Sequence, residues 1–129
     1  MDKTEKIFLV DDDEIHLSIL ENILKDKYEV ITAKSGKDAL EYMLKGVVPN
    51  LILLDILMPD LDGWEIFNRL RAVSFLKNVP IVFLTSVNES AEVTHAQEIG
   101  AADYITKPYD KDDLLDRIEK ILEKSTTLP

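Results

Sequence analysis

Continuous apolar runs alternate along the chain with segments in which apolar residues recur every three or four positions. The continuous runs are typical of buried strands, and the spaced pattern is typical of amphipathic helices. The predicted strands occupy 7–10, 28–33, 51–54, 81–84 and 104–105. After the first strand, apolar residues recur at helical spacing at Ile15, Ile19, Leu20, Ile23 and Leu24. The same order repeats along the chain, so the pattern predicts five strand–helix units.

Local signals place the ends of the other predicted helices. Ser35-Gly36-Lys37-Asp38 resembles a capping box that opens the second helix, which ends near Gly46. The third helix follows the loop 55–63 and carries Ile66, Phe67 and Leu70 on one side. The fourth helix spans about 89–99 and stops at Gly100, and the fifth spans 110–123.

Strands that are apolar throughout are expected in a parallel sheet covered by helices on both faces. Right-handed crossovers would join them, so the predicted fold class is α/β, a doubly wound five-stranded parallel sheet with five helices. The 129 residues fit one domain, which we expect to occupy 1–124. Residues 125–129 lack periodicity and are expected to form a disordered tail or the start of a linker.

Composition and charge narrow the classes of function. No apolar run approaches the roughly 20 residues that cross a bilayer, so no membrane association is expected. Residues 1–6 lack the pattern of a secretory signal, and the chain has no cysteine, so a cytoplasmic location without disulfides or thiolate chemistry is expected. The net charge of −10 argues against nucleic acid as a direct partner, because phosphate backbones are bound by clustered Lys and Arg.

Polar residues that could bind a ligand or take part in catalysis follow four of the predicted strands. These residues are Asp11 and Asp12 after the first strand, Asp55 after the third, Thr85 and Ser86 after the fourth, and Lys107-Pro108 after the fifth. In a doubly wound sheet the ligand site lies outside the carboxyl ends of the strands. Three carboxylates, a hydroxyl and an ammonium group are therefore expected to converge there.

The carboxylates predict a divalent cation. Two like charges about 4 Å apart repel by roughly 4 kcal/mol at an effective dielectric near 20, so the cluster needs a cation to stay ionised. Mg²⁺ (or Mn²⁺) fits an all-oxygen site that also receives phosphate oxygens. With the metal and Lys107 neutralising a phosphoryl group, the carboxylate of Asp55 can attack phosphorus and form an acyl phosphate, while Thr85 bonds a phosphoryl oxygen.

The motifs around these residues resemble those of a known family. They are Phe8-Leu9-Val10-Asp11-Asp12-Asp13, Leu53-Leu54-Asp55-Ile56-Leu57-Met58-Pro59 with Asp62-Gly63, Leu84-Thr85-Ser86, and the stretch 100–108 ending in Thr106-Lys107-Pro108. In sequence and order they are similar to the receiver domains of two-component response regulators, over nearly the whole chain. The resemblance implies a flavodoxin-like strand order of 2-1-3-4-5 and a cis bond between Lys107 and Pro108.

The resemblance also implies roles for individual residues. Asp12, Asp55 and the backbone carbonyl of Leu57 would bind Mg²⁺ directly, and Asp11 would do so through water. Thr85 and Lys107 would contact the phosphoryl group on Asp55, which a sensor histidine kinase or phosphotransfer protein would donate. The domain would catalyse only its own phosphorylation and dephosphorylation, as a signalling switch and not a metabolic enzyme.

Thr85 and Tyr104 are expected to form the switch that relays phosphorylation to the surface of the fourth helix, fifth strand and fifth helix. A downstream protein or an output domain would bind that surface. The winged-helix branch of the family usually has an acidic residue where Ala102 stands and a basic one near Val93. Because this chain departs from both, we expect a monomer or a weak dimer.

Other functions and other residues fit the sequence less well. A haloacid-dehalogenase-like phosphohydrolase would need a second Asp where Leu57 stands, and the four glycines cannot form a dinucleotide or P-loop motif. A scaffold that is never phosphorylated remains an alternative. His16 and His95 receive no role, and Asp60 and Asp62 are expected to shape the loop and cap its helix.

Overall fold

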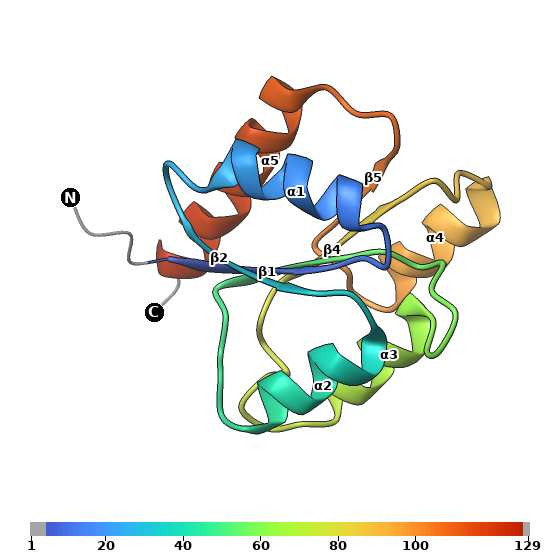
Figure 1. The fold of residues 1–129 in the computed structure, drawn as a ribbon. Coiled ribbons are helices and arrows are strands. Elements are labelled where there is room, and N and C mark those ends of the chain that lie inside the picture. The colour runs from blue at the N-terminus through green and yellow to red at the C-terminus, as the bar shows by residue number, and fades with distance from the viewer. Residues whose placement is uncertain (1–4, 128–129) are drawn as a thin grey trace.

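Five parallel strands form one sheet at the centre of the computed structural model, which describes residues 5–127 (Figure 1). The strands are β1 (Lys6–Val10), β2 (Glu29–Ala33), β3 (Leu51–Leu54), β4 (Ile81–Thr85) and β5 (Asp103–Thr106). Their spatial order is β2-β1-β3-β4-β5, which confirms the doubly wound sheet and the implied order. Val10 pairs with both Ala33 and Leu54, so the carboxyl ends of the three strands are level.

Helices cover both faces of the sheet (Figure 1). They are α1 (Glu14–Leu24), α2 (Gly36–Leu44), α3 (Gly63–Arg71), α4 (Ser90–Glu98) and α5 (Lys111–Thr127). Helices α1 and α5 lie on one face, and α2 and α3 lie on the other, where α4 also contributes its one buried residue, Ala96. No helix in the described residues is long and apolar enough to span a membrane.

The core consists of two apolar layers, one on each face of the sheet. Successive side chains of a strand point to opposite faces. Phe8 of β1 therefore packs toward α2 and α3, whereas its neighbour Leu9 packs toward α1 and α5. The inner strands β1, β3 and β4 contribute to both layers, which explains the uninterrupted apolar runs at 7–10, 51–54 and 81–84.

Side chains that begin the helices fix how the chain leaves the sheet. Asp13 begins α1 by accepting hydrogen bonds from the amides of Ile15 and His16, at 3.0 and 3.3 Å. Ser35 accepts from the amide of Asp38 at 3.1 Å, which confirms the predicted cap of α2. These caps hold the β1–α1 and β2–α2 loops at the edge where the strands end.

Two segments differ from the sequence pattern. Helix α5 continues to Thr127, beyond its predicted end at 123, and residues 128–129 of the predicted tail lie outside the described residues. Ile15 and Ile19 belong to the apolar pattern of the first helix, yet their exposed fractions are 74% and 48%. Their neighbours Leu17, Leu20 and Leu24 form the buried side of α1 instead.

Candidate functional site

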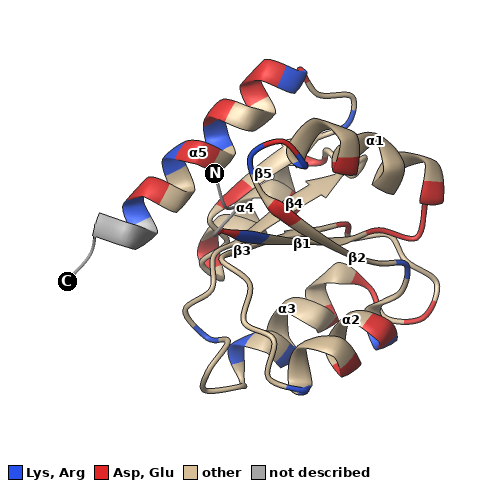
Figure 2. Ribbon diagram, turned by 60° about the vertical axis from the view of Figure 1, so that its left-hand side comes forward, with Lys and Arg blue, Asp and Glu red and all other residues tan. Residues whose placement is uncertain are grey.

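Three carboxylates meet at the carboxyl edge of the sheet. Ligand oxygens of Asp11, Asp12 and Asp55 all lie within 4.8 Å of one another. Asp11 and Asp55 are buried, whereas Asp12 is exposed at the start of the acidic segment that leads from β1 into α1 (red in Figure 2). The structure therefore brings together the three acidic residues that the sequence predicts to converge. The cluster is open to solvent on the side of Asp12.

The sheet itself holds the two buried carboxylates in place. The amide of Asp55 donates a hydrogen bond of 2.9 Å to the carbonyl of Val10, and the amide of Asp11 donates one of 3.2 Å to the carbonyl of Ala33. Both residues directly follow a strand and are still bonded to the neighbouring strand. Their side chains consequently start from a rigid backbone, as a preorganised reaction site requires.

Lys107 reaches the same cluster from the end of β5. Its Nζ lies 3.0 Å from Asp11 Oδ2 and 3.5 Å from Asp55 Oδ2. The backbone amide of Lys107 donates a hydrogen bond of 2.8 Å to the carbonyl of Thr85. The Lys107–Pro108 peptide bond is cis, as the resemblance implied.

The two buried carboxyl groups differ in their electrostatics. Burial opposes the ionisation of Asp11, but hydrogen bonds from His16, the Asp13 amide and Lys107 outweigh it and lower the pKa of Asp11 to about 2. Burial raises the pKa of Asp55, and Lys107 only partly offsets that rise because the charge of Asp11 adds to it. The positive charge of Lys107 alone therefore does not fully compensate an ionised Asp55. A cluster of carboxylate oxygens of this kind fits a hard divalent cation.

The predicted switch residues are connected through Val87 of the β4–α4 loop. Thr85 is fully buried, and its Oγ1 accepts a hydrogen bond of 3.3 Å from the amide of Val87. The hydroxyl of Tyr104 donates a hydrogen bond of 2.6 Å to the carbonyl of the same residue. The Thr85 hydroxyl also lowers the pKa of Asp55, so one short chain of contacts links the acidic cluster to the surface around Tyr104.

Gly63 allows the loop after β3 to pack closely against the backbone of Asp55. The Gly63 amide donates a hydrogen bond of 2.9 Å to the carbonyl of Ile56. A Cβ atom at position 63 would lie 2.5 Å from the carbonyl oxygen of Asp55, so only glycine allows this approach.

Asp62 caps α3, and Asp60 accepts hydrogen bonds from two amides at the start of α2. Both aspartates therefore shape the loop, as the sequence predicts. The side chain of Leu57 in the same loop is 58% exposed.

One residue of this site was missed by reasoning from the sequence. His16 lies in the first turn of α1, with Nδ1 2.7 Å from Asp11 Oδ2 and Nε2 2.9 Å from the hydroxyl of Tyr109. The only local signal is that Asp13 caps the helix, which turns the first-turn residues back toward the acidic segment. His95, in contrast, lies on α4 with its ring 4.8 Å from that of Trp64.

Comparison with known proteins agrees with this geometry. The response regulator receiver domain family matches residues 7–119, which include every residue of the acidic cluster, Thr85 and Lys107. The chain belongs to this family. Among the solved structures that share its fold are two that are more than a quarter identical to it in sequence.

One of these structures is the receiver domain of a signal transduction histidine kinase from Syntrophus aciditrophicus, with a TM-score of 0.86 and 28% identity. It covers 98% of this chain, which covers 96% of it in turn. The other is the chemotaxis protein CheY4 of Vibrio cholerae, with a TM-score of 0.83, 29% identity and coverages of 91% and 98%.

A curated relative is the alkaline phosphatase synthesis transcriptional regulatory protein PhoP of Bacillus subtilis, 37% identical over 122 residues. The alignment covers 94% of this receiver domain but 50% of PhoP, so the chain spans about half the length of this relative.

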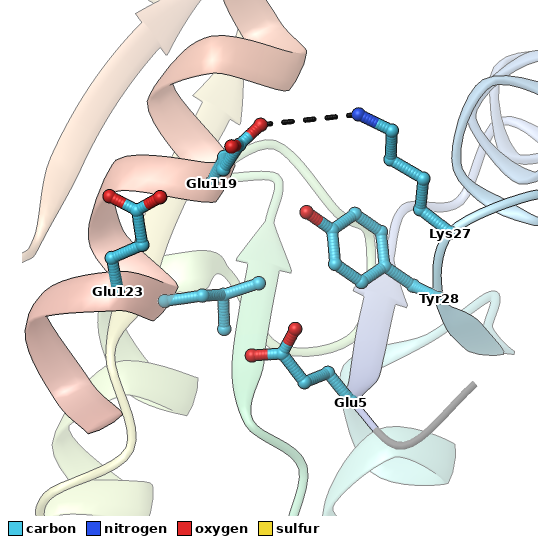
Figure 3. Close-up of a pocket in the computed structure, with 6 residues that line it drawn as sticks. Glu5, Lys27, Tyr28, Glu119 and Glu123 are labelled. Atoms are coloured by element: carbon cyan, nitrogen blue, oxygen red, sulfur yellow. Dashed lines mark ion pairs between the residues drawn. The ribbon is translucent and has the colours of Figure 1, made fainter. Parts of the chain in front are cut away.

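A second acidic pocket lies at the opposite edge of the receiver domain (Figure 3). Glu5 precedes β1 and Tyr28 precedes β2, so this pocket opens at the amino ends of the strands. Across it, Lys27 and Glu119 form an ion pair of 3.9 Å. Burial and the nearby glutamates raise the pKa of Tyr28. The pocket shares no residue with the cluster around Asp55.

Proposed function

We propose that this receiver domain takes a phosphoryl group from a histidine of a sensor kinase or phosphotransfer protein onto Asp55, in a step that depends on Mg²⁺ (or Mn²⁺). The observation that supports it most is the convergence of Asp11, Asp12 and Asp55 within 4.8 Å, with the Lys107 ammonium 3.5 Å from Asp55. Because the donor set consists of oxygens with one face open to solvent, it fits a cation that keeps several waters.

In this proposal Asp12, Asp55 and the backbone carbonyl of Leu57 hold the metal, with Asp11 acting through a water molecule. The bound ion would neutralise charge on the phosphoryl oxygens. A carboxylate oxygen of Asp55 forms a bond to phosphorus, the phosphorus–nitrogen bond of the donor breaks, and its electron pair returns to the imidazole. Lys107 and Thr85 bond the transferred oxygens, which are the groups that need stabilising as charge develops.

We propose further that the domain is a switch and not a metabolic enzyme. A phosphohydrolase that uses an Asp nucleophile needs an acid for the leaving group, and the position two residues after Asp55 is an exposed leucine. The only reactions catalysed would then be phosphorylation and dephosphorylation of Asp55 itself.

The signal would leave through the surface formed by α4, β5 and α5. Tyr104 and Thr85 both bond to Val87, so displacement of the Thr85 hydroxyl toward a phosphoryl group would release one side of that loop. A downstream protein or an output domain would bind the altered surface. The domain itself would act in the cytoplasm as a monomer or weak dimer. Its net charge of −10 argues against direct contact with nucleic acid.

Intact-mass spectrometry tests the proposal directly. Incubation with acetyl phosphate or phosphoramidate and Mg²⁺ should add one phosphoryl group to the wild-type protein. The Asp55→Asn variant and a wild-type sample with a chelator should both stay unmodified. Modification of either control to the same extent as wild type with Mg²⁺ would contradict transfer to a metal-assisted Asp55.

A further inference from the structure

His16 connects Asp11 of the acidic cluster to Tyr109 in the loop between β5 and α5. Its side chain is 12% exposed, and it lies between Asp11 at the end of β1 and Tyr109 in that loop. The two ring nitrogens contact different partners, at 2.7 Å and 2.9 Å. The imidazole and the Tyr109 ring also pack with their centroids 5.6 Å apart.

Asp11 Oδ2 receives two side-chain donors, whereas Oδ1 is bonded by the backbone. Lys107 Nζ lies 3.0 Å from Oδ2 and His16 Nδ1 lies 2.7 Å from the same atom. The Asp13 amide donates to Oδ1 at 2.9 Å. With a side-chain exposure of only 4%, Asp11 has little access to bulk water that could replace a lost donor. A buried carboxylate without donors is strongly unfavourable.

The proposed transfer to Asp55 requires the ammonium group of Lys107 to move from Asp11 to the phosphoryl group. The ammonium group is shared between Asp11 and Asp55 in the unphosphorylated protein, and the phosphoryl oxygens would attract it away from Asp11. Of the two side-chain donors to Oδ2 of Asp11, only His16 would then remain. His16 is in place for this task, because its contact with Oδ2 does not involve Asp55 or Lys107.

The partner of the second ring nitrogen decides which nitrogen carries the proton. The Tyr109 hydroxyl can donate to Nε2, which leaves Nδ1–H to donate to Asp11 in a neutral ring. A hydroxyl that donates to one nitrogen and a carboxylate that accepts from the other would select this tautomer and hold the ring in one orientation.

We propose that His16 is a positioning residue for phosphorylation: held by Tyr109, it keeps a hydrogen bond on Asp11 Oδ2 and so lets Lys107 move to the phosphoryl group. The inference rests on the proposed function of Asp55. It assigns His16 no contact with the transferred group. Its effect is exerted through Asp11 and is therefore separable from the packing of the ring.

Two amide substitutions separate the two ends of the imidazole. The side-chain amide of His16→Asn can place a donor near the position of Nδ1, whereas that of His16→Gln can place one near Nε2. Both variants lose the ring and its packing on Tyr109, so each is the control for the other. The His16→Ala variant removes both ends.

Titration with beryllofluoride at saturating Mg²⁺, followed by backbone amide NMR, measures binding of a phosphoryl mimic without turnover. We expect His16→Ala to bind it about tenfold more weakly than wild type, as loss of one charge-assisted hydrogen bond predicts. His16→Asn should stay close to wild type, and His16→Gln should resemble His16→Ala. Tyr109→Phe should weaken binding in the wild-type background and have no effect in the His16→Asn background.

A second measurement needs neither metal nor phosphoryl mimic. Imidazole nitrogen spectra of the metal-free protein at pH 8 should show the proton of His16 on Nδ1. Equal beryllofluoride affinity in wild type and His16→Ala, equal affinity in the two amide variants, or a proton on Nε2 would each overturn the role of His16. Failure of the wild-type protein to bind beryllofluoride would instead overturn the proposed function, and the inference about His16 with it.

Discussion

The ammonium group of Lys107 lies closer to Asp11 than to the proposed phosphoacceptor, at 3.0 Å from Oδ2 of Asp11. Its distance to Asp55 Oδ2 is 3.5 Å. In the protein without bound ligands Lys107 therefore compensates the carboxylate that already has the lower pKa. Lys107 lies beside Asp55 but is bonded more closely to Asp11. A phosphoryl group on Asp55 would be a stronger acceptor for the ammonium group than the Asp11 carboxylate.

Replacing Lys107 by Met, which keeps the length of the side chain and removes its charge, should separate metal binding from phosphoryl binding. Mg²⁺ affinity should stay the same or rise, because a competing cation is lost from the cluster. Affinity for beryllofluoride should fall by about tenfold or more. Calorimetric titration of each ligand checks both outcomes, with Lys120→Met on the exposed side of α5 as the control. Loss of Mg²⁺ binding in Lys107→Met would contradict the assignment of Lys107 to the phosphoryl group alone.

Asp55→Asn should stabilise the metal-free protein at neutral pH. The folded pKa of Asp55 is raised, so the stability from this group is present below its ordinary value of 3.8 and is lost as pH rises through the folded pKa. An amide cannot ionise, so the variant avoids that loss. Thermal unfolding with a chelator should show a higher Tm than wild type at pH 7 and no such gain near pH 3.

Asp11→Asn should have the opposite effect on the metal-free protein. The pKa of Asp11 is about 2, below its ordinary value of 3.8, so its stabilisation is present above pH 3.8 and is lost as pH falls toward 2. The variant should therefore have a lower Tm than wild type at pH 7, measured by the same unfolding experiment. Equal shifts for the two variants would show that their surroundings do not differ as described.

Gly63→Ala should destabilise the protein although alanine favours helices. Helix propensity would stabilise the variant by at most about 1 kcal/mol, the value for a helix interior, because Gly63 is the first residue of α3. The added Cβ would lie 2.5 Å from the Asp55 carbonyl oxygen and 2.8 Å from the Ile56 Cα, and such overpacking costs about 1–3 kcal/mol.

We expect urea unfolding of Gly63→Ala to show the loss and Mg²⁺ to stabilise this variant less than wild type. Asn68→Ala, at an exposed position of the same helix, should instead gain a few tenths of a kcal/mol. A Gly63→Ala variant as stable as the Asn68→Ala control would contradict the close packing of the loop on Asp55.

Thr85→Ala should uncouple the acidic cluster from the surface of α4, β5 and α5. Addition of beryllofluoride to the wild-type protein should shift amide signals across 90–122 as well as at the cluster. In Thr85→Ala the shifts should be confined to the cluster, because the bond from the Val87 amide to Thr85 is lost. Coupling of this kind is commonly about 1–3 kcal/mol.

Tyr104→Phe keeps the ring but removes the hydroxyl that bonds to Val87, so it should alter the same surface before any ligand is added. Tyr42→Phe, at an exposed tyrosine of α2, is the matched control and should leave the response intact. If Thr85→Ala relays the signal to 90–122 as fully as wild type, the coupling through Val87 is wrong.

The alternation of apolar runs and spaced apolar residues was enough to predict the five strands and the α/β class, because both patterns are local consequences of backbone geometry. The meeting of Asp11, Asp12 and Asp55 followed from the rule that parallel strands end at one edge. The strand order and the cis bond before Pro108 were available only through the family resemblance, since neither is encoded in a local pattern.

Only the tertiary structure placed His16 in the site. His16 and Tyr109 are separated by 93 positions, and their contact exists because α1 and α5 cover the same face of the sheet. The closeness of Gly63 to Asp55 and the shared bonds of Thr85 and Tyr104 to Val87 are likewise visible only in the folded chain. Periodicity reports which residues of one element face the core, but contacts between elements depend on the crossovers and the strand register.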